Sequence, residues 1–71
     1  MNYEDEKRKA EIFSERKTLV HISKTNDIFL NGIILEVGKD FVVIKDRFDG
    51  GEQFILFSEL KKSIEPFRED E

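Results

Sequence analysis

Residues 20–32 read VHISKTNDIFLNG, and this stretch decides the fold class. Apolar Val20 and Ile22 alternate with polar residues, which is the two-residue period of a β-strand. The Thr-Asn-Asp run at 25–27 favours a turn, because Asn and Asp side chains bond their own backbone and tolerate left-handed angles. A second apolar run follows directly. The stretch therefore predicts a β-hairpin.

The sequence beyond this hairpin predicts further short strands joined by tight turns. Gly32 lies inside a long second strand, where a missing side chain is typical of a bend or a bulge. Asp49-Gly50-Gly51 is a strong hairpin signal, and Pro66 ends the last strand. A long strand with an internal glycine suits a barrel, because one strand must bend through both halves of a curved sheet. The expected strands cover residues 19–24, 28–37, 41–46, 53–57 and 63–66.

The segment before the strands has helical character. Acidic residues at 4–6 precede basic residues at 7–9, an order that complements the helix dipole. We therefore expect a helix over residues 4–17, laid on the sheet because its apolar stripe is narrow. The expected fold is mostly β: one domain over residues 1–71, a small, strongly bent, five-stranded antiparallel barrel with an N-terminal α-helix.

Composition narrows the classes of function. The chain has 71 residues, no cysteine and a net charge of −4. Without cysteine it forms no disulfide, which suits a reducing cytoplasm, where we expect it to act. Its apolar runs fall far short of the roughly 18 residues of a membrane helix, so we expect no membrane association. The net negative charge argues against non-specific binding to phosphate backbones. It does not conflict with a local basic patch that binds nucleic acid.

The predicted second to fourth strands are apolar on both faces. A barrel of this size cannot bury all of these side chains, and large exposed apolar patches are uncommon on monomers. We therefore expect a subunit interface; the alternative is that the helix and the curled strands bury everything within one chain. On the second strand, alternation places Ile28, Leu30 and Ile34 on one side and Phe29, Ile33, Leu35 and Val37 on the other.

Residues 20–32 resemble the first hairpin of the Sm-like (LSm/Hfq-like) RNA-binding family, which reads as alternating apolar residues, an Asn-containing turn, then apolar-apolar-polar-Gly. Residues 33–46 match the family's long bent strand, acidic turn and third strand, and residues 53–66 match its last two strands. The resemblance spans about residues 5–66 and implies an Sm/SH3-like barrel. Other SH3-like barrels share much of this pattern.

The resemblance implies a homo-oligomeric ring, a hexamer or heptamer, in which the fourth strand of one chain pairs with the fifth strand of the next. We expect Ile55, Phe57 and Ile64 at this subunit interface. It also implies binding of single-stranded, U-rich or A-rich RNA, with bases stacked on side chains around the pore or on a ring face.

Two groups of residues are carried over as expected RNA contacts. The residues that match the family's pore-side pocket are Lys39, Phe41 and Ser58. Those that match the other face of the family's ring are Lys24, Phe29 and Asn31. The sequence departs from the family in the turn after the fourth strand. The family has Tyr-Lys-His or Arg-Gly there, whereas this chain has a neutral to acidic Ser-Glu pair at 58–59.

No residue pattern indicates enzyme chemistry. The single histidine, His21, falls on the polar side of the first strand, and we expect it to be a surface or helix-packed side chain. A lone histidine makes neither a metal site nor a nucleophile pair, so we expect no metal, cofactor or small-molecule substrate. Two functions remain open: a non-enzymatic, ring-forming RNA chaperone or RNA-metabolism scaffold, or an acidic SH3-like protein-interaction and assembly module that does not bind RNA.

Overall fold

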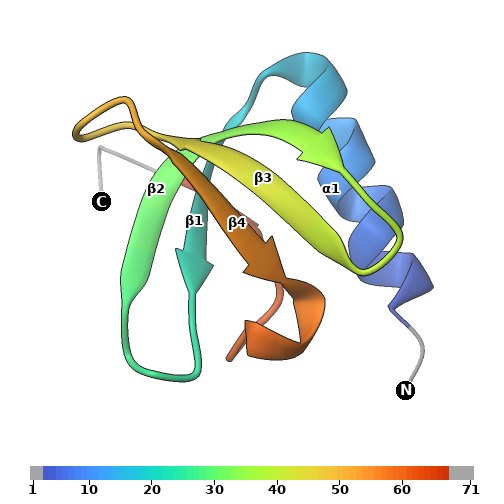
Figure 1. Cartoon of the computed structure of the whole chain (residues 1–71). Coiled ribbons are helices and arrows are strands. Elements are labelled where there is room, and N and C mark those ends of the chain that lie inside the picture. Colours follow the sequence, from blue (N-terminus) through green and yellow to red (C-terminus); the bar gives the residue numbers. More distant parts are fainter. Residues whose placement is uncertain (1–2, 68–71) are drawn as a thin grey trace.

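The computed structural model describes residues 3–67, and it has one N-terminal helix followed by a five-stranded antiparallel sheet (Figure 1). The mostly β fold class predicted from the sequence is confirmed. Residues 1–2 and 68–71 of the expected single domain lie outside the described residues. The elements are α1 (Glu4–Arg16), β1 (Leu19–Ser23), β2 (Phe29–Val37), β3 (Phe41–Asp46), β4 (Glu52–Leu56), the 3₁₀ turn η1 (Phe57–Glu59) and β5 (Glu65–Pro66).

Helix α1 ends in a left-handed turn and packs on the sheet through a small apolar face. Lys17 has a φ of 54°, and Thr18 donates its backbone N–H to Phe13 O at 2.9 Å, which satisfies a carbonyl at the helix end. Ala10 is fully buried, and Ser14 Oγ donates to Ile34 O at 2.9 Å, which links the helix to β2. Within residues 3–67, no helix is long and apolar enough to span a bilayer.

The sheet has the strand order β4-β3-β2-β1-β5, with all neighbours antiparallel. Its strong bend passes through β2 (Figure 1). At Gly32 an added Cβ would lie 2.1 Å from the backbone oxygen of Lys45, so β2 and β3 approach each other more closely than a side chain allows. A register shift between Ile34 and Glu36 adds a second irregularity to the same strand.

This register shift changes which side chains of β2 face the core. Simple alternation places Val37 on the side of Phe29, but Val37 packs against the core. A bulge inserts one extra residue and so reverses the alternation beyond it. Among residues 3–67, the core is formed by nine buried residues from the helix, the strands, η1 and the segment just before β5: Ala10, Val20, Ile22, Ile34, Val42, Ile44, Ile55, Phe57 and Ile64.

The outer face of the sheet keeps apolar side chains exposed. Phe29 is 58% exposed, Leu35 47% and Phe54 59%. Helix α1 does not cover them, because its buried Ala10 belongs to the core on the inner face. The chain therefore does not bury all of its apolar side chains by itself.

We predict that Gly32→Ala destabilises the chain, because the new methyl group meets backbone and Ile44 Cγ2 on β3. Overpacking of this kind costs about 1–3 kcal/mol. Gly51→Ala is the matched control, since the nearest atom to its Cβ is a side-chain oxygen of Asp49 at 3.1 Å, which can rotate away. Urea unfolding measures both; equal stability of the two variants would contradict a close approach at Gly32.

Candidate nucleic-acid interface

The first hairpin builds an aromatic and polar cluster on the outer face of the sheet. Its register places His21 opposite Asn31 and Ser23 opposite Phe29. The His21 and Phe29 rings stack with centroids 5.6 Å apart and an interplanar angle of 15°. His21 Nδ1 donates to Asn31 Oδ1 at 2.6 Å, which leaves the amide nitrogen of Asn31 for another acceptor. The cluster therefore offers an exposed ring and a side-chain donor.

The turn of this hairpin is held by local bonds of the kind expected for Asn and Asp. Asp27 has a φ of 65° and donates its backbone N–H to Lys24 O at 3.0 Å. Ile28 N donates to Asn26 Oδ1 at 3.3 Å. Lys24, an expected RNA contact, is half-buried where β1 ends, next to the cluster.

A second cluster forms where the β2–β3 turn meets η1. The rings of Phe41 and Phe54 stack with centroids 4.7 Å apart, across the β3–β4 pair. Phe57 N donates to Asp40 O at 2.9 Å, which ties the start of η1 to the turn. The structure thereby brings the expected contacts Lys39, Phe41 and Ser58 to the same end of the sheet.

Turn η1 also contacts the first hairpin, on its other side. Thr25 N donates to Glu59 O at 2.9 Å, and Lys61 N donates to Ser23 O at 2.8 Å. The Lys61 ammonium lies 3.0 Å from Asp27 Oδ1, in an exposed ion pair worth little by itself. Turn η1 therefore bonds both the β2–β3 turn and the first hairpin, and Figure 1 shows it at the base of the molecule.

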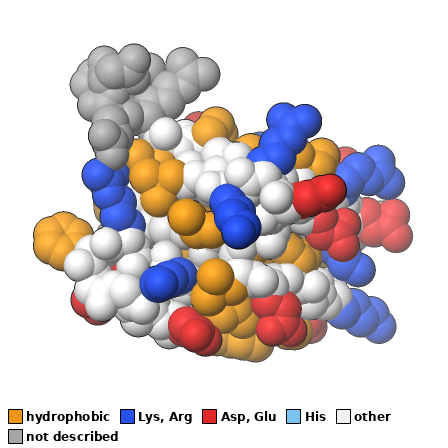
Figure 2. Space-filling view, turned by 90° about the horizontal axis from the view of Figure 1, so that it is seen from above, with side chains coloured by type: hydrophobic (Ala, Val, Ile, Leu, Met, Phe, Trp, Pro, Cys, Tyr) orange, Lys and Arg blue, Asp and Glu red, His pale blue; other side chains and the backbone are white. Residues whose placement is uncertain are grey.

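The charge around the second cluster is not basic. Glu59 follows Ser58 directly, and its Oε1 accepts the backbone N–H of Leu56 at 3.0 Å. On the face seen in Figure 2, Lys and Arg side chains are scattered between acidic and hydrophobic ones instead of gathering in one patch. In the part of the chain that the structure describes, no group of three or more His, Asp or Glu residues is arranged to hold a metal ion.

The expected interface residues lie inside the chain's own core. Ile55 is 1% exposed, Phe57 2% and Ile64 0%, so a neighbouring copy cannot cover their side chains. Their side chains therefore add nothing to a subunit contact, and their place at the interface through the backbone stays a prediction. On β4 the outward apolar side chains are those of Phe54 and Leu56. A strand that is apolar on both faces does not show from its sequence which face is inward.

Two members of the clusters were missed as site residues. His21 was expected to be a surface or helix-packed side chain, yet it stacks on Phe29 on the outer face. Its place follows from the hairpin register, in which a turn centred on residues 25–27 sets His21 opposite Asn31. The sequence does not single out Phe54, because its stacking on Phe41 depends on the β3–β4 register.

We predict that Phe41 and Phe54 stabilise each other. A double-mutant cycle with Phe41→Ala and Phe54→Ala should give a coupling free energy of about 0.5–1.5 kcal/mol, as for stacked aromatic pairs. Phe29→Ala combined with Phe54→Ala is the control, because these rings belong to different clusters and their effects should add. Urea unfolding of all variants is the measurement; equal coupling in both cycles would refute the stack.

Comparison with known proteins supports the fold. No protein-family model matches the sequence, and no curated protein matches it. Among solved structures, the chain is similar to the pleiotropic translational regulator Hfq, with a TM-score of 0.73. That match covers 90% of this chain and 98% of the other at 22% sequence identity, so it shows a common fold.

Proposed function

We propose that this chain is a non-enzymatic, Sm-like RNA-binding protein whose copies assemble into a ring. The observation that carries the proposal is the open, bent sheet with aromatic clusters on its outer face. Its two edges are β4 and β5, and among residues 3–67 no further strand pairs with either. Unpaired edges invite pairing with another chain.

Assembly through these edges accounts for the apolar surface that the single chain exposes. Antiparallel pairing of β4 with β5 of the next copy would continue the sheet from one subunit to another. Phe54 and Leu56 project outward from the β4 edge and would lie beside the neighbour. A contact between two different edges is heterologous, and it closes into a ring when the rotation between copies allows. The resemblance to Sm-like proteins favours six or seven copies.

The two clusters supply the chemistry that single-stranded RNA needs. At each expected site the chain supplies one aromatic residue, one lysine and one small polar residue: Phe29, Lys24 and Asn31 in the first hairpin, and Phe41, Lys39 and Ser58 near η1. Base stacking on aromatic rings contributes about 1–3 kcal/mol per base. Stacking on an aromatic ring accepts any base. The expected preference for U-rich or A-rich strands therefore rests on the family resemblance.

A second candidate function is an acidic protein-interaction and assembly module on the same fold. The observation that favours it is the charge: the chain has a net charge of −4, and Glu59 stands in η1 where the family carries a basic signature. Such a module would keep the edge-to-edge assembly and would lack affinity for RNA.

We predict that the wild-type chain forms an assembly and that Phe54→Asp dissociates it, because a charge at the β4 edge is costly to bury beside a neighbour. Native mass spectrometry measures the mass, and circular dichroism checks that the fold persists. Leu35→Asp is the control, since Leu35 is similarly exposed but lies on the interior strand β2. A monomeric wild-type mass would refute the ring.

We predict that single-stranded U-rich or A-rich oligonucleotides bind and that Phe29→Ala or Phe41→Ala weakens binding about 5- to 150-fold, the equivalent of one stacked base. Ile12→Ala, an exposed apolar change on α1, is the control. Fluorescence anisotropy at several salt concentrations measures the affinity. Absence of binding even at low salt would favour the protein-interaction module.

A further inference from the structure

His21 and Asn31 form a polar pair on the outer face of the first hairpin. They lie directly opposite each other on β1 and β2, so their side chains project from the same face of the sheet. His21 Nδ1 donates to Asn31 Oδ1 at 2.6 Å. Both residues are half-buried, so the imidazole and the amide are held by their surroundings and still reach the surface.

The imidazole is held from a second direction by an aromatic ring. The His21 and Phe29 rings stack with centroids 5.6 Å apart, and Phe29 is 58% exposed. Phe29 and Asn31 are two residues apart on β2, which is about 7 Å along the strand. A base stacked on Phe29 would therefore bring its polar edge close to the pair.

The bond between His21 and Asn31 determines which hydrogen-bonding groups remain. Asn31 Oδ1 is engaged, so Asn31 Nδ2 is left as a donor, and in the neutral imidazole Nε2 is left as an acceptor. If the amide is turned over, Asn31 Nδ2 donates to His21 Nδ1, and the remaining groups are an Oδ1 acceptor and an Nε2–H donor. In both arrangements the pair presents one donor and one acceptor.

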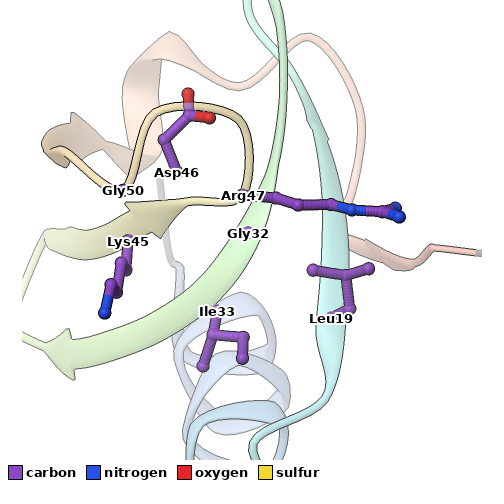
Figure 3. Close-up of a pocket in the computed structure, with 7 residues that line it drawn as sticks. All are labelled: Leu19, Gly32, Ile33, Lys45, Asp46, Arg47 and Gly50. Atoms are coloured by element: carbon purple, nitrogen blue, oxygen red, sulfur yellow. The ribbon is translucent and has the colours of Figure 1, made fainter.

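The charges around this pair do not select an anion. Glu65 lies opposite His21 on β5 and is exposed. Arg47 N donates to Asn31 O at 2.8 Å, and the Arg47 side chain extends from the β3–β4 hairpin across β1 (Figure 3). Its guanidinium lies over the Phe67 ring, 5.2 Å from the centroid. One acid and one base therefore flank the pair, and an uncharged polar group fits it better than a phosphate.

We propose that His21 is a positioning residue of the RNA site, which holds the Asn31 amide so that the pair offers one donor and one acceptor to the edge of a base stacked on Phe29. The inference rests on the proposed RNA-binding function and names the group that the first hairpin recognises. That group is a base edge with a donor beside an acceptor. Adenine has such an edge at its 6-amino group and ring nitrogens, and uracil has one at N3–H and O4.

The test measures whether a base analogue and a His21 substitution depend on each other. The probes are an A-rich strand, the same strand with purine in place of adenine, a U-rich strand, and the same strand with 3-methyluracil in place of uracil. Each analogue lacks one donor of the base edge. In the strand that binds more tightly, the wild-type chain should prefer the natural base several-fold, because the analogue leaves a polar group of the site unpaired.

His21→Phe keeps a ring beside Phe29 but cannot bond Asn31, so the preference for the natural base should fall close to one. Asn31→Ala should have the same effect, and the double variant should show no further change. Phe41→Ala is the control, because this ring belongs to the second cluster. It should weaken binding of the natural strand and its analogue equally. Fluorescence anisotropy measures the affinities, and circular dichroism checks the fold.

NMR of the wild-type chain gives a readout that does not depend on substitution. The ring signals of His21 and the side-chain amide signals of Asn31 should shift with the natural strand and shift less with its analogue. If strands bind while these signals stay unmoved, or while His21→Phe keeps the wild-type preference, the positioning role is refuted and the proposed function stands. If no strand binds, both are refuted.

Discussion

The bent sheet is built around the close approach of β2 and β3 at Gly32. An added methyl group there would meet the backbone oxygen of Lys45 at 2.1 Å. Because of this close approach and the register shift after Ile34, the long strand β2 can take part in both halves of a strongly bent sheet. The bend gathers the nine buried residues, from the helix, the strands, η1 and the segment before β5, around one small core. A flat sheet of the same strands would leave much of that surface in water.

The bend also decides what is left outside. Once the inner face is filled, Phe29, Leu35 and Phe54 remain exposed on the outer face, and β4 and β5 remain the edges of the sheet. Large exposed apolar patches are uncommon on monomers, and the proposed ring would cover part of this surface. Edge pairing between copies would cover the region near β4, while the aromatic rings farther from the edge stay available for bases.

The charge of the chain limits how it would bind RNA. The chain is acidic overall, and the turn after β4 lacks the basic residues of the Sm-like pattern. Non-specific attraction to phosphate is therefore weak, and binding would depend on stacking and on a few placed cations. A pocket beside the β3–β4 hairpin holds the exposed Lys45 in one row with Ile33 and Leu19 (Figure 3).

Periodicity and local backbone preferences were enough to predict the element order, the turns and the helix. Strand alternation also predicts that Phe29 and Asn31 share a face, since they are two residues apart on β2. The inward face of each doubly apolar strand depends on the fold, which buries the side chains of Ile55, Phe57 and Ile64 in the core. Other contacts join residues from separate strands and loops. Examples are the bonds of η1 to both turns and the row that Leu19, Ile33 and Lys45 form across three strands. Such contacts arise from the bend and the register of the whole sheet, which no local pattern encodes.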